Sequence, residues 1–267
     1  MYDRRVKAIG TLALLCAATT TGEAAPGLTL DPGHVFVQLD LELNASSGAV
    51  GKPFSIAPDV SVGATSDLTV SLIHSTYGTT GFRGGTGLGL CVTGTGDGGC
   101  PHPYNNVGGE AVYSLVKGDA AMALVAGVYS LDLADHWVDL KVGFKTRFAS
   151  GPLALTVNPS VYAGLDHRDG TPPNLDQLYV PIGLGYKLSP VVTVGVGSGV
   201  KGPLADFSRF GDKFTVPLGV NAVVTIDPML AVGGSFTFGK LVGGTALPDA
   251  ATGVDYRGIH VWLNYTH

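Results

Sequence analysis

Charged residues are scarce in this chain, and long apolar runs are missing after its first two dozen residues. Asp, Glu, Lys and Arg make up 14% of the 267 residues, against about 25% in a typical soluble domain. So few charges leave a surface that is too apolar for an ordinary soluble protein. A membrane helix needs about 20 consecutive apolar residues, and no such run follows the N-terminal segment. If the chain crosses a membrane, it crosses with strands.

The chain also lacks an excess of positive charge. Its formal net charge is −5, so it has no basic patch with which to neutralise the phosphates of a nucleic acid. We therefore expect no nucleic-acid partner. No stretch is typical of a flexible linker between separately packed halves, and a length of 267 residues is compatible with one large domain.

The N-terminus has the features of a secretory signal. Three basic residues precede the apolar run AIGTLALLCAATTT, namely Arg4, Arg5 and Lys7. We predict a signal peptide over residues 1–24, cut after Ala24, and a short lead over residues 25–32. The alternatives are a membrane anchor, for which the apolar run is short, and a lipoprotein modified at Cys16, which a bulky residue precedes.

Cysteine is rare as well, which limits covalent and metal chemistry. Cleavage of the signal removes Cys16 and leaves Cys91 and Cys100 in the Gly-rich stretch GLGLCVTGTGDGGCPHP. In an exported protein such a pair predicts a disulfide, here one that closes a small surface loop. A metal site with His102 is the alternative, but two Cys and one His do not complete a ligand set. We expect no metal and no cofactor.

What the chain does contain is one pattern that repeats after residue 32. Stretches of alternating apolar and polar residues recur about twelve times, within a range of roughly 10 to 14. Short connections rich in turn residues fall at 65–67, 117–119, 149–152, 188–190 and 226–228. Longer connections dense in Gly, Asp, Thr and Pro fall between them, at 45–53, 75–105, 131–137, 166–176, 201–213 and 240–257.

This regular exchange of short and long connections is typical of an outer-membrane barrel. A β-sandwich with Greek-key crossovers would not sort its connections by length in this way. We therefore predict an all-β fold, a closed antiparallel up-and-down transmembrane β-barrel over residues 33–267. With an even number of strands, both termini lie on the side of the short turns, which is the periplasm in such barrels.

The two faces of the predicted strands agree with this fold. In GHVFVQLDLELN (33–44) the aliphatic residues share one face, while Asp40 and Glu42 lie on the other. The same division recurs in VDLKVGFKTRF (138–148) and over 214–224. In a membrane barrel the aliphatic face contacts lipid and the polar face lines the lumen. The predicted lumen-facing residues are Asp40, Glu42, Asp59, Glu110, Asp139, Lys141, Lys145, Arg147, Lys187 and His260.

Aromatic residues and prolines add finer expectations. Five aromatic residues near strand ends are predicted to form the interfacial girdles: Tyr129, Trp137, Phe148, Tyr186 and Tyr265. Four prolines interrupt predicted strands, where the missing N–H predicts bulges or irregular pairing: Pro58, Pro159, Pro181 and Pro217.

With its hairpin DVSVGATSDLTVSL (59–72), this pattern resembles the outer-membrane β-barrel proteins of Gram-negative bacteria in general, over essentially the whole mature chain. The resemblance implies the lipid and lipopolysaccharide of the outer membrane and the barrel-assembly machinery as partners. Barrels of this class usually end in Phe or Trp. This chain ends Tyr265-Thr266-His267, so its assembly signal departs from that pattern.

No motif supports catalysis. His74 and Ser75 are adjacent, and adjacent residues of a strand point to opposite faces, so they cannot pair as a serine esterase requires. The letters S-x-x-K at 114–117 stand without their accompanying motifs. The glycines of GVGSGV (195–200) open no helix that would bind a phosphate. We expect no enzyme.

The lumen charges then have two interpretations. They form ion pairs that brace a closed interior, or they line a path for permeating solutes. The corresponding functions are a small porin-like channel for polar solutes and a structural or surface-interaction barrel acting through its loops. A barrel enzyme that modifies lipids is the remaining alternative. The loop over 75–105 is compatible with surface binding and with a constriction of the lumen.

Overall fold

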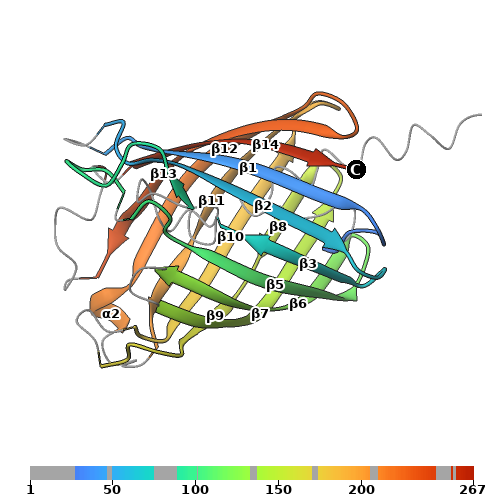
Figure 1. Cartoon of the computed structure of the whole chain (residues 1–267). Helices are drawn as coiled ribbons and strands as arrows, with labels where there is room; N and C mark the ends of the chain where they lie inside the picture. Colours follow the sequence, from blue (N-terminus) through green and yellow to red (C-terminus); the bar gives the residue numbers. More distant parts are fainter. Residues whose placement is uncertain are drawn as a thin grey trace, which may run out of the picture.

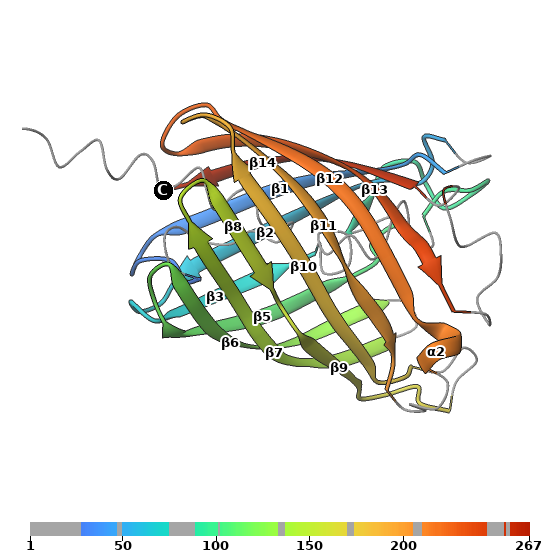
Figure 2. The same cartoon turned by 180° about the vertical axis from the view of Figure 1, so that it is seen from behind.

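The computed structural model of the chain shows one closed β-barrel (Figures 1 and 2). The structure describes residues 28–46, 50–74, 89–100, 102–132, 137–169, 174–204, 210–244, 254 and 257–267. The strands are β1 (Val35–Asn44), β2 (Phe54–Gly63), β3 (Leu68–Ile73), β4 (Leu90–Cys91), β5 (Val107–Val116), β6 (Ala120–Asp132), β7 (Trp137–Ser150), β8 (Leu153–Val157), β9 (Ser160–Gly164), β10 (Gln177–Lys187), β11 (Val192–Pro203), β12 (Thr215–Thr225), β13 (Leu230–Gly243) and β14 (Arg257–Thr266).

The wall has twelve strand positions, because β3 and β4 occupy parts of one position and β8 and β9 occupy another. Neighbouring strands are antiparallel, and β1 pairs with both β2 and β14, which closes the barrel. The predicted fold class and strand number are confirmed. The seam of the barrel lies between β1 and β14, the last strand of the chain.

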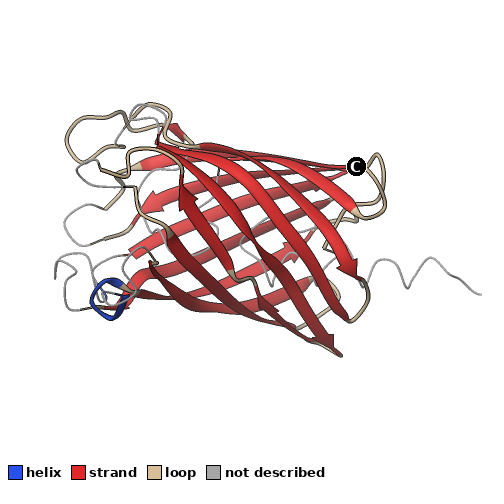
Figure 3. Cartoon of the chain, turned by 90° about the horizontal axis from the view of Figure 1, so that it is seen from below, coloured by secondary structure: helices blue, strands red, loops and turns tan. Residues whose placement is uncertain are grey.

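The connections are sorted by length between the two ends of the barrel. Short turns join β2 to β3, β5 to β6, β7 to β8, β10 to β11 and β12 to β13. Figure 3 shows the longer loops at the opposite end, together with the short helix α2 (Phe210–Lys213). The C-terminus lies at the short-turn end. Among the residues described, no helix is long and apolar enough to cross a bilayer.

Alternation along each strand separates an apolar outer face from a polar inner face. In β1, Asp40 is 2% exposed whereas its neighbour Leu39 is 37% exposed. In β7, Lys141 and Lys145 are buried, and Phe144 between them is exposed on the outer face. The aliphatic residues therefore cover the outside of the barrel and the charged residues line its interior, which confirms the inside-out assignment of the faces.

The four prolines of the predicted strands all lie at or beside irregular places in the wall, as the sequence predicts. Pro159 separates β8 from β9, and the register of β12 on β13 shifts around Pro217. Pro181 lies within β10, directly beside the interruption between β8 and β9. Its carbonyl accepts a hydrogen bond of 3.0 Å from the N–H of Asn158. Pro58 lies where the partner of β2 changes from β3 to β4. Missing N–H groups thus coincide with changes of pairing.

The wall position shared by β3 and β4 is held by polar side chains. The N–H of His74, just after β3, donates to Oδ1 of Asp59 at 2.6 Å. The ring of His74 bonds to the carbonyl of Pro58 and, at 2.6 Å, to the hydroxyl of Tyr104. Asn106 donates to the carbonyl of His74 at 2.7 Å. These contacts replace the ladder hydrogen bonds that a continuous strand would make.

Candidate functional site: the lumen

One carboxylate and two lysines meet on the inner face of the wall formed by β5, β6 and β7. Nζ of Lys141 lies 2.6 Å from Oε2 of Glu110, and Nζ of Lys145 lies 2.7 Å from Oε1. The hydroxyl of Tyr129 donates to Oε2 at 2.5 Å. The side chain of Glu110 is 1% exposed. Alternation explains the arrangement, because Lys145 follows Lys141 by four positions, an even offset, and both side chains therefore share the inner face of β7.

This cluster carries more positive than negative charge. Two ammonium groups face a single carboxylate, so a formal charge of about +1 remains on this side of the lumen. A buried charge that loses its partner is strongly destabilising, because its desolvation is then uncompensated. The Glu110 cluster therefore braces β5 against β7 and at the same time makes this wall of the lumen basic.

An acidic group lies nearly opposite. Around the wall, β1 is separated from β7 by four strand positions on one side and six on the other. Oδ2 of Asp40 on β1 lies 3.6 Å from Nδ1 of His260 on β14. Oε2 of Glu42 accepts a hydrogen bond of 3.4 Å from Ser55. Asp40 and His260 thus lie close together inside the barrel, and the lumen has an acidic wall facing a basic one.

A row of three tyrosines lines the same side as the Glu110 cluster. The ring centroids of Tyr129 and Tyr162 lie 5.9 Å apart, and those of Tyr162 and Tyr179 lie 4.8 Å apart. Nζ of Lys141 is 5.7 Å from the centroids of Tyr129 and Tyr162, and Nζ of Lys201 is 4.8 Å from that of Tyr179. Each distance is within the range of a cation–π interaction.

The assignment of Tyr129 to an interfacial girdle is wrong. Its side chain points inward and is 1% exposed. The ring lies over Gly108 of β5, where an added Cβ would come within 1.9 Å of a ring carbon. The inner face of β6 carries small residues before Tyr129, which leaves room for the ring to fold into the lumen. Phe148, Tyr186 and Tyr265 are exposed on the outer face, and the side chain of Trp137 lies outside the described residues.

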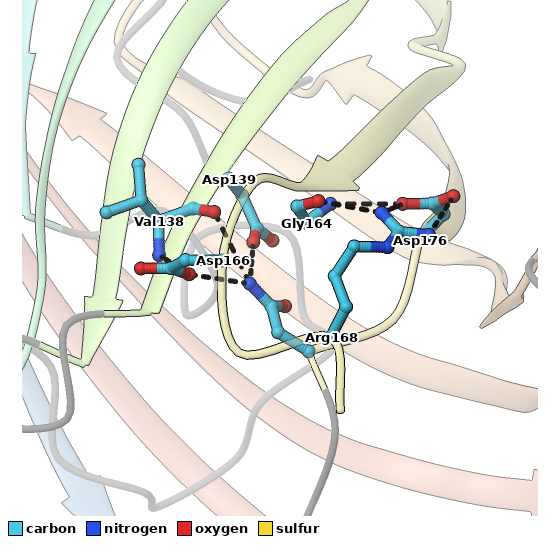
Figure 4. A network of polar contacts seen from close by, with 7 residues as sticks. Val138, Asp139, Gly164, Asp166, Arg168 and Asp176 are labelled. Atoms are coloured by element: carbon cyan, nitrogen blue, oxygen red, sulfur yellow. Dashed lines mark hydrogen bonds and ion pairs between the residues drawn. The ribbon is translucent and has the colours of Figure 1, made fainter. Parts of the chain in front are cut away.

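Asp139 joins a network at the long-loop end (Figure 4). Nδ2 of Asn174, in the loop after β9, donates to Oδ1 of Asp139 at 2.7 Å. It also contacts Oδ1 of Asp166 at 3.4 Å, and that oxygen accepts the N–H of Val138 at 2.8 Å. Oδ2 of Asp139 is buried and has no hydrogen-bond partner within the described part of the chain.

The same loop is fastened by a two-pronged ion pair. Nη1 and Nη2 of Arg168 lie 2.7 and 3.0 Å from the two carboxylate oxygens of Asp176. Nη1 also donates to the carbonyl of Gly164 at 2.7 Å. The hydrogen bonds from Arg168 lower the pKa of the Asp176 carboxyl below its usual value. Both ends of this loop are thereby tied to the rim of the barrel.

The remaining predicted residues lie apart from these groups. Arg147 is near the short-turn end, where its Nη2 donates to the carbonyl of Gly118 at 3.3 Å. Lys187 is half-buried at the same end.

Cys91 and Cys100 form a disulfide beside β4, with Cα atoms 5.9 Å apart. The predicted cleavage site at Ala24 lies outside the described residues. Within the described residues, no group of three or more His, Cys, Asp or Glu is arranged to hold a metal ion.

Sequence reasoning missed the tyrosine row and the loop residues. Tyr162 does stand in the polar phase of its strand, which is the signal that it points inward. Lys201 and Asn174 carried no such signal, because both lie in segments that the pattern assigned to loops. Their roles depend on how far β11 extends and on how the loop after β9 folds back.

Solved structures with the same barrel are known, although no family model and no curated protein matches the chain. The NanC porin superposes with a TM-score of 0.60 at 9% identity, covering 85% of this chain and 98% of its own. An outer-membrane channel from Pseudomonas putida F1 gives 0.54 at 10% identity, covering 90% and 97%. The KdgM porin gives 0.52 at 8% identity, covering 86% and 98%.

The chain has the fold of outer-membrane porins. At these identities the similarity concerns the fold alone. The chemistry of this lumen has to be inferred from its own residues.

Proposed function

We propose that the protein is an integral outer-membrane barrel that acts as a narrow, porin-like channel for the passive passage of small polar solutes. The observation that carries this proposal is the charged lumen, with Glu110, Lys141 and Lys145 on one wall and Asp40 and Glu42 on the wall nearly opposite. Opposed charges across a passage orient polar solutes and favour them over apolar ones.

The proposed orientation in the membrane follows from the connections. In bacterial barrels the short turns face the periplasm and the long loops face outward, so both termini are periplasmic in our proposal. Outer-membrane lipid and lipopolysaccharide then surround the apolar face, and the barrel-assembly machinery inserts the chain. NanC and KdgM are described as porins, which supports the proposal of a porin-like channel.

The path is narrow. Apart from Lys187, the predicted lumen charges are buried although they point into the barrel, so protein atoms surround them on the inside as well as in the wall. A wide water-filled pore would leave such side chains exposed. We therefore restrict the proposal to ions and small polar solutes.

A structural or surface-interaction barrel is the second candidate, and the same cluster supports it. Glu110 accepts hydrogen bonds from two lysines and one tyrosine, as expected of charges that brace a closed interior. Enzyme activity has less support. The ring of His74 contacts Pro58 and Tyr104, while Ser75 lies outside the described residues.

Conductance of the refolded chain over residues 25–267 in planar bilayers tests the proposal. We expect steady single-channel currents. Combining Glu110→Gln, Lys141→Gln and Lys145→Gln removes the net positive charge without leaving a charge unpaired, so the reversal potential should move toward cation selectivity. A matched control combines Asp67→Asn and Lys117→Gln, an exposed ion pair of 2.8 Å outside the lumen, and should not move it. A folded barrel that gives no current, either as the intact chain or without residues 25–31, would overturn the proposal in favour of the second candidate.

A further inference from the structure

The residues just before β1 enter the barrel instead of extending its wall. Leu28, Thr29 and Leu30 are buried. They precede a strand that starts at the short-turn end, so they lie at that mouth of the lumen. We refer to Leu28–Asp31 as the N-terminal segment.

Leu28 packs against an apolar strip on the lumen side of β5 and β6. The strip consists of Val112, Ala121, Ala123 and Val125, all of which are buried with Leu28 in one cluster. Elsewhere the inner face of these strands carries polar or aromatic residues such as Glu110 and Tyr129. An apolar strip at the mouth of a polar lumen would be unfavourable if it faced water. The leucine that covers it removes that surface from water.

Backbone and side-chain contacts fix the course of the N-terminal segment across the mouth. The N–H of Leu30 donates to Oγ1 of Thr69 on β3 at 2.7 Å. The hydroxyl of Thr29 lies 3.4 Å from the carbonyl of Ser66 in the turn before β3. Leu30 also packs against Phe36 on the inner face of β1. An added Cβ at Gly63 would lie 2.1 Å from the carbonyl oxygen of Asp31, so β2 is shaped to let the segment pass.

These contacts connect one side of the mouth to the other. The segment leaves β1, passes over the end of β2, bonds to β3 and ends on β5 and β6. A chain that lies across a narrow mouth in this way occupies the space through which a solute would leave. The N-terminal segment is held mainly by its two leucines and two hydrogen bonds. A turn at residues 32 and 33 follows the segment, and His34 alone separates this turn from β1.

We propose that the N-terminal segment is a built-in stopper of the short-turn mouth, docked on the apolar strip of β5 and β6, and that its release widens the passage. This inference rests on the proposed channel function. The stopper is held mainly by apolar contacts, so its docking should change little with ionic strength.

Docking can be tested without any measurement of transport. Ala123→Cys places a thiol in the strip under Leu28, at a site that is 0% exposed, and the disulfide leaves no other reactive cysteine in the chain over residues 25–267. A water-soluble maleimide is applied to the folded barrel with the segment intact, with residues 25–31 deleted, and with Leu28→Asp plus Leu30→Asp. Labelling should be about tenfold faster or more without the docked leucines, since burial of even one leucine shifts an equilibrium by that factor.

Conductance of the same three proteins tests the stopper. Both altered proteins should conduct more than the intact chain. Leu188→Asp, a change at an exposed leucine of the same end, is the matched control and should alter neither readout. Migration of unheated samples on denaturing gels verifies that each variant has folded.

The outcomes separate the inference from the proposed function. Unchanged labelling of Ala123→Cys after deletion of the segment would overturn the docking. Faster labelling with currents that stay the same would overturn the stopper role while the channel stands. Faster labelling with no current from any of the proteins would overturn the channel and the stopper together, and leave only the docked segment. Faster labelling with larger currents would support the inference.

Discussion

The two opposed walls of the lumen handle charge in different ways. On the side of β5 and β7, each oxygen of Glu110 has an ammonium group within 2.7 Å. On the side of β1 and β14, Asp40 and Glu42 share the neighbourhood of His260, whose Nδ1 is 3.6 Å from Asp40. The first wall is a compact ion cluster with fixed charges. The second is acidic, and His260 offsets that charge only when it is protonated. Bracing is thus concentrated on the basic wall, and in the proposed channel the acidic wall is better suited to selecting among solutes.

The largest effect should come from removing the acid of the basic wall. Glu110→Ala leaves two buried lysines without a carboxylate, and we expect a loss of about 3–5 kcal/mol in the free energy of unfolding. Urea unfolding of the refolded barrel in detergent or lipid measures it. Asp67→Ala, which breaks the exposed ion pair with Lys117, is the control and should change the stability far less. Equal losses in the two variants would contradict the bracing role.

A smaller loss should follow from disturbing the tyrosine that donates to Glu110. Gly108→Ala places a methyl group where the ring of Tyr129 now lies, so the ring must move and the barrel should lose about 1–3 kcal/mol of stability. The adjacent Gly109 has no atom within 4 Å of an added Cβ. Gly109→Ala is therefore the matched control in the same unfolding assay. If both substitutions were equally tolerated, the tyrosine would not be supporting the cluster.

These two predictions depend on contacts that the sequence could only partly foresee. Alternation assigned Glu110, Lys141 and Lys145 correctly to the inner face, because the side-chain period of a strand is two. It could not show that they meet, since that depends on the register of β5 on β6 and of β6 on β7. The position of Tyr129 was misjudged for a related reason. An aromatic residue near a strand end suits a girdle, and only the glycine opposite it reveals that the ring folds inward.

The acidic wall should affect selectivity more than stability. Asp40→Asn keeps the shape of the side chain and removes one negative charge, so the reversal potential should shift toward anions. The shift is opposite in sign to the one expected for the variant that combines Glu110→Gln, Lys141→Gln and Lys145→Gln on the basic wall. Planar-bilayer recordings at a salt gradient measure both shifts. Shifts of the same sign would show that the two walls do not act as opposed charges on the same path.

The smallest effect concerns the loop after β9. Because Arg168 lowers the pKa of Asp176, the ion pair contributes stability that is present above the ordinary carboxyl value of 3.8 and is lost as the pH falls through the lowered value. We expect faster hydrogen exchange of the loop in Asp176→Asn than in the unaltered chain at neutral pH, and equal exchange in strong acid. A difference that persisted in acid would mean that the ion pair does not hold the loop. The side chains are partly exposed, so the barrel itself should be unaffected.

The lengths of the connections were the part of the fold most open to prediction. Turn residues mark each short turn, and the strand number of about twelve followed from the count of alternating stretches. The break between β3 and β4 was not foreseen, because the side chains of His74 and Asn106 take over there from a regular ladder. The sequence could not predict the contacts of the loop residues Asn174, Arg168 and Asp176 either. Polar residues in a long loop give no indication of which of them fold back onto the barrel.

The seam between β1 and β14 has a consequence for how the barrel forms. Val35 and His267, at the two ends of the described sheet, exchange a pair of backbone hydrogen bonds of 2.9 Å each. These bonds join residues separated by nearly the whole barrel sequence, so they gain nothing until every strand between them is in place. Loop closure over such a distance makes folding slow and cooperative. A chain cut short by even one hairpin therefore has no smaller stable barrel of the same register to fall back on, and its two unpaired edges are open to aggregation.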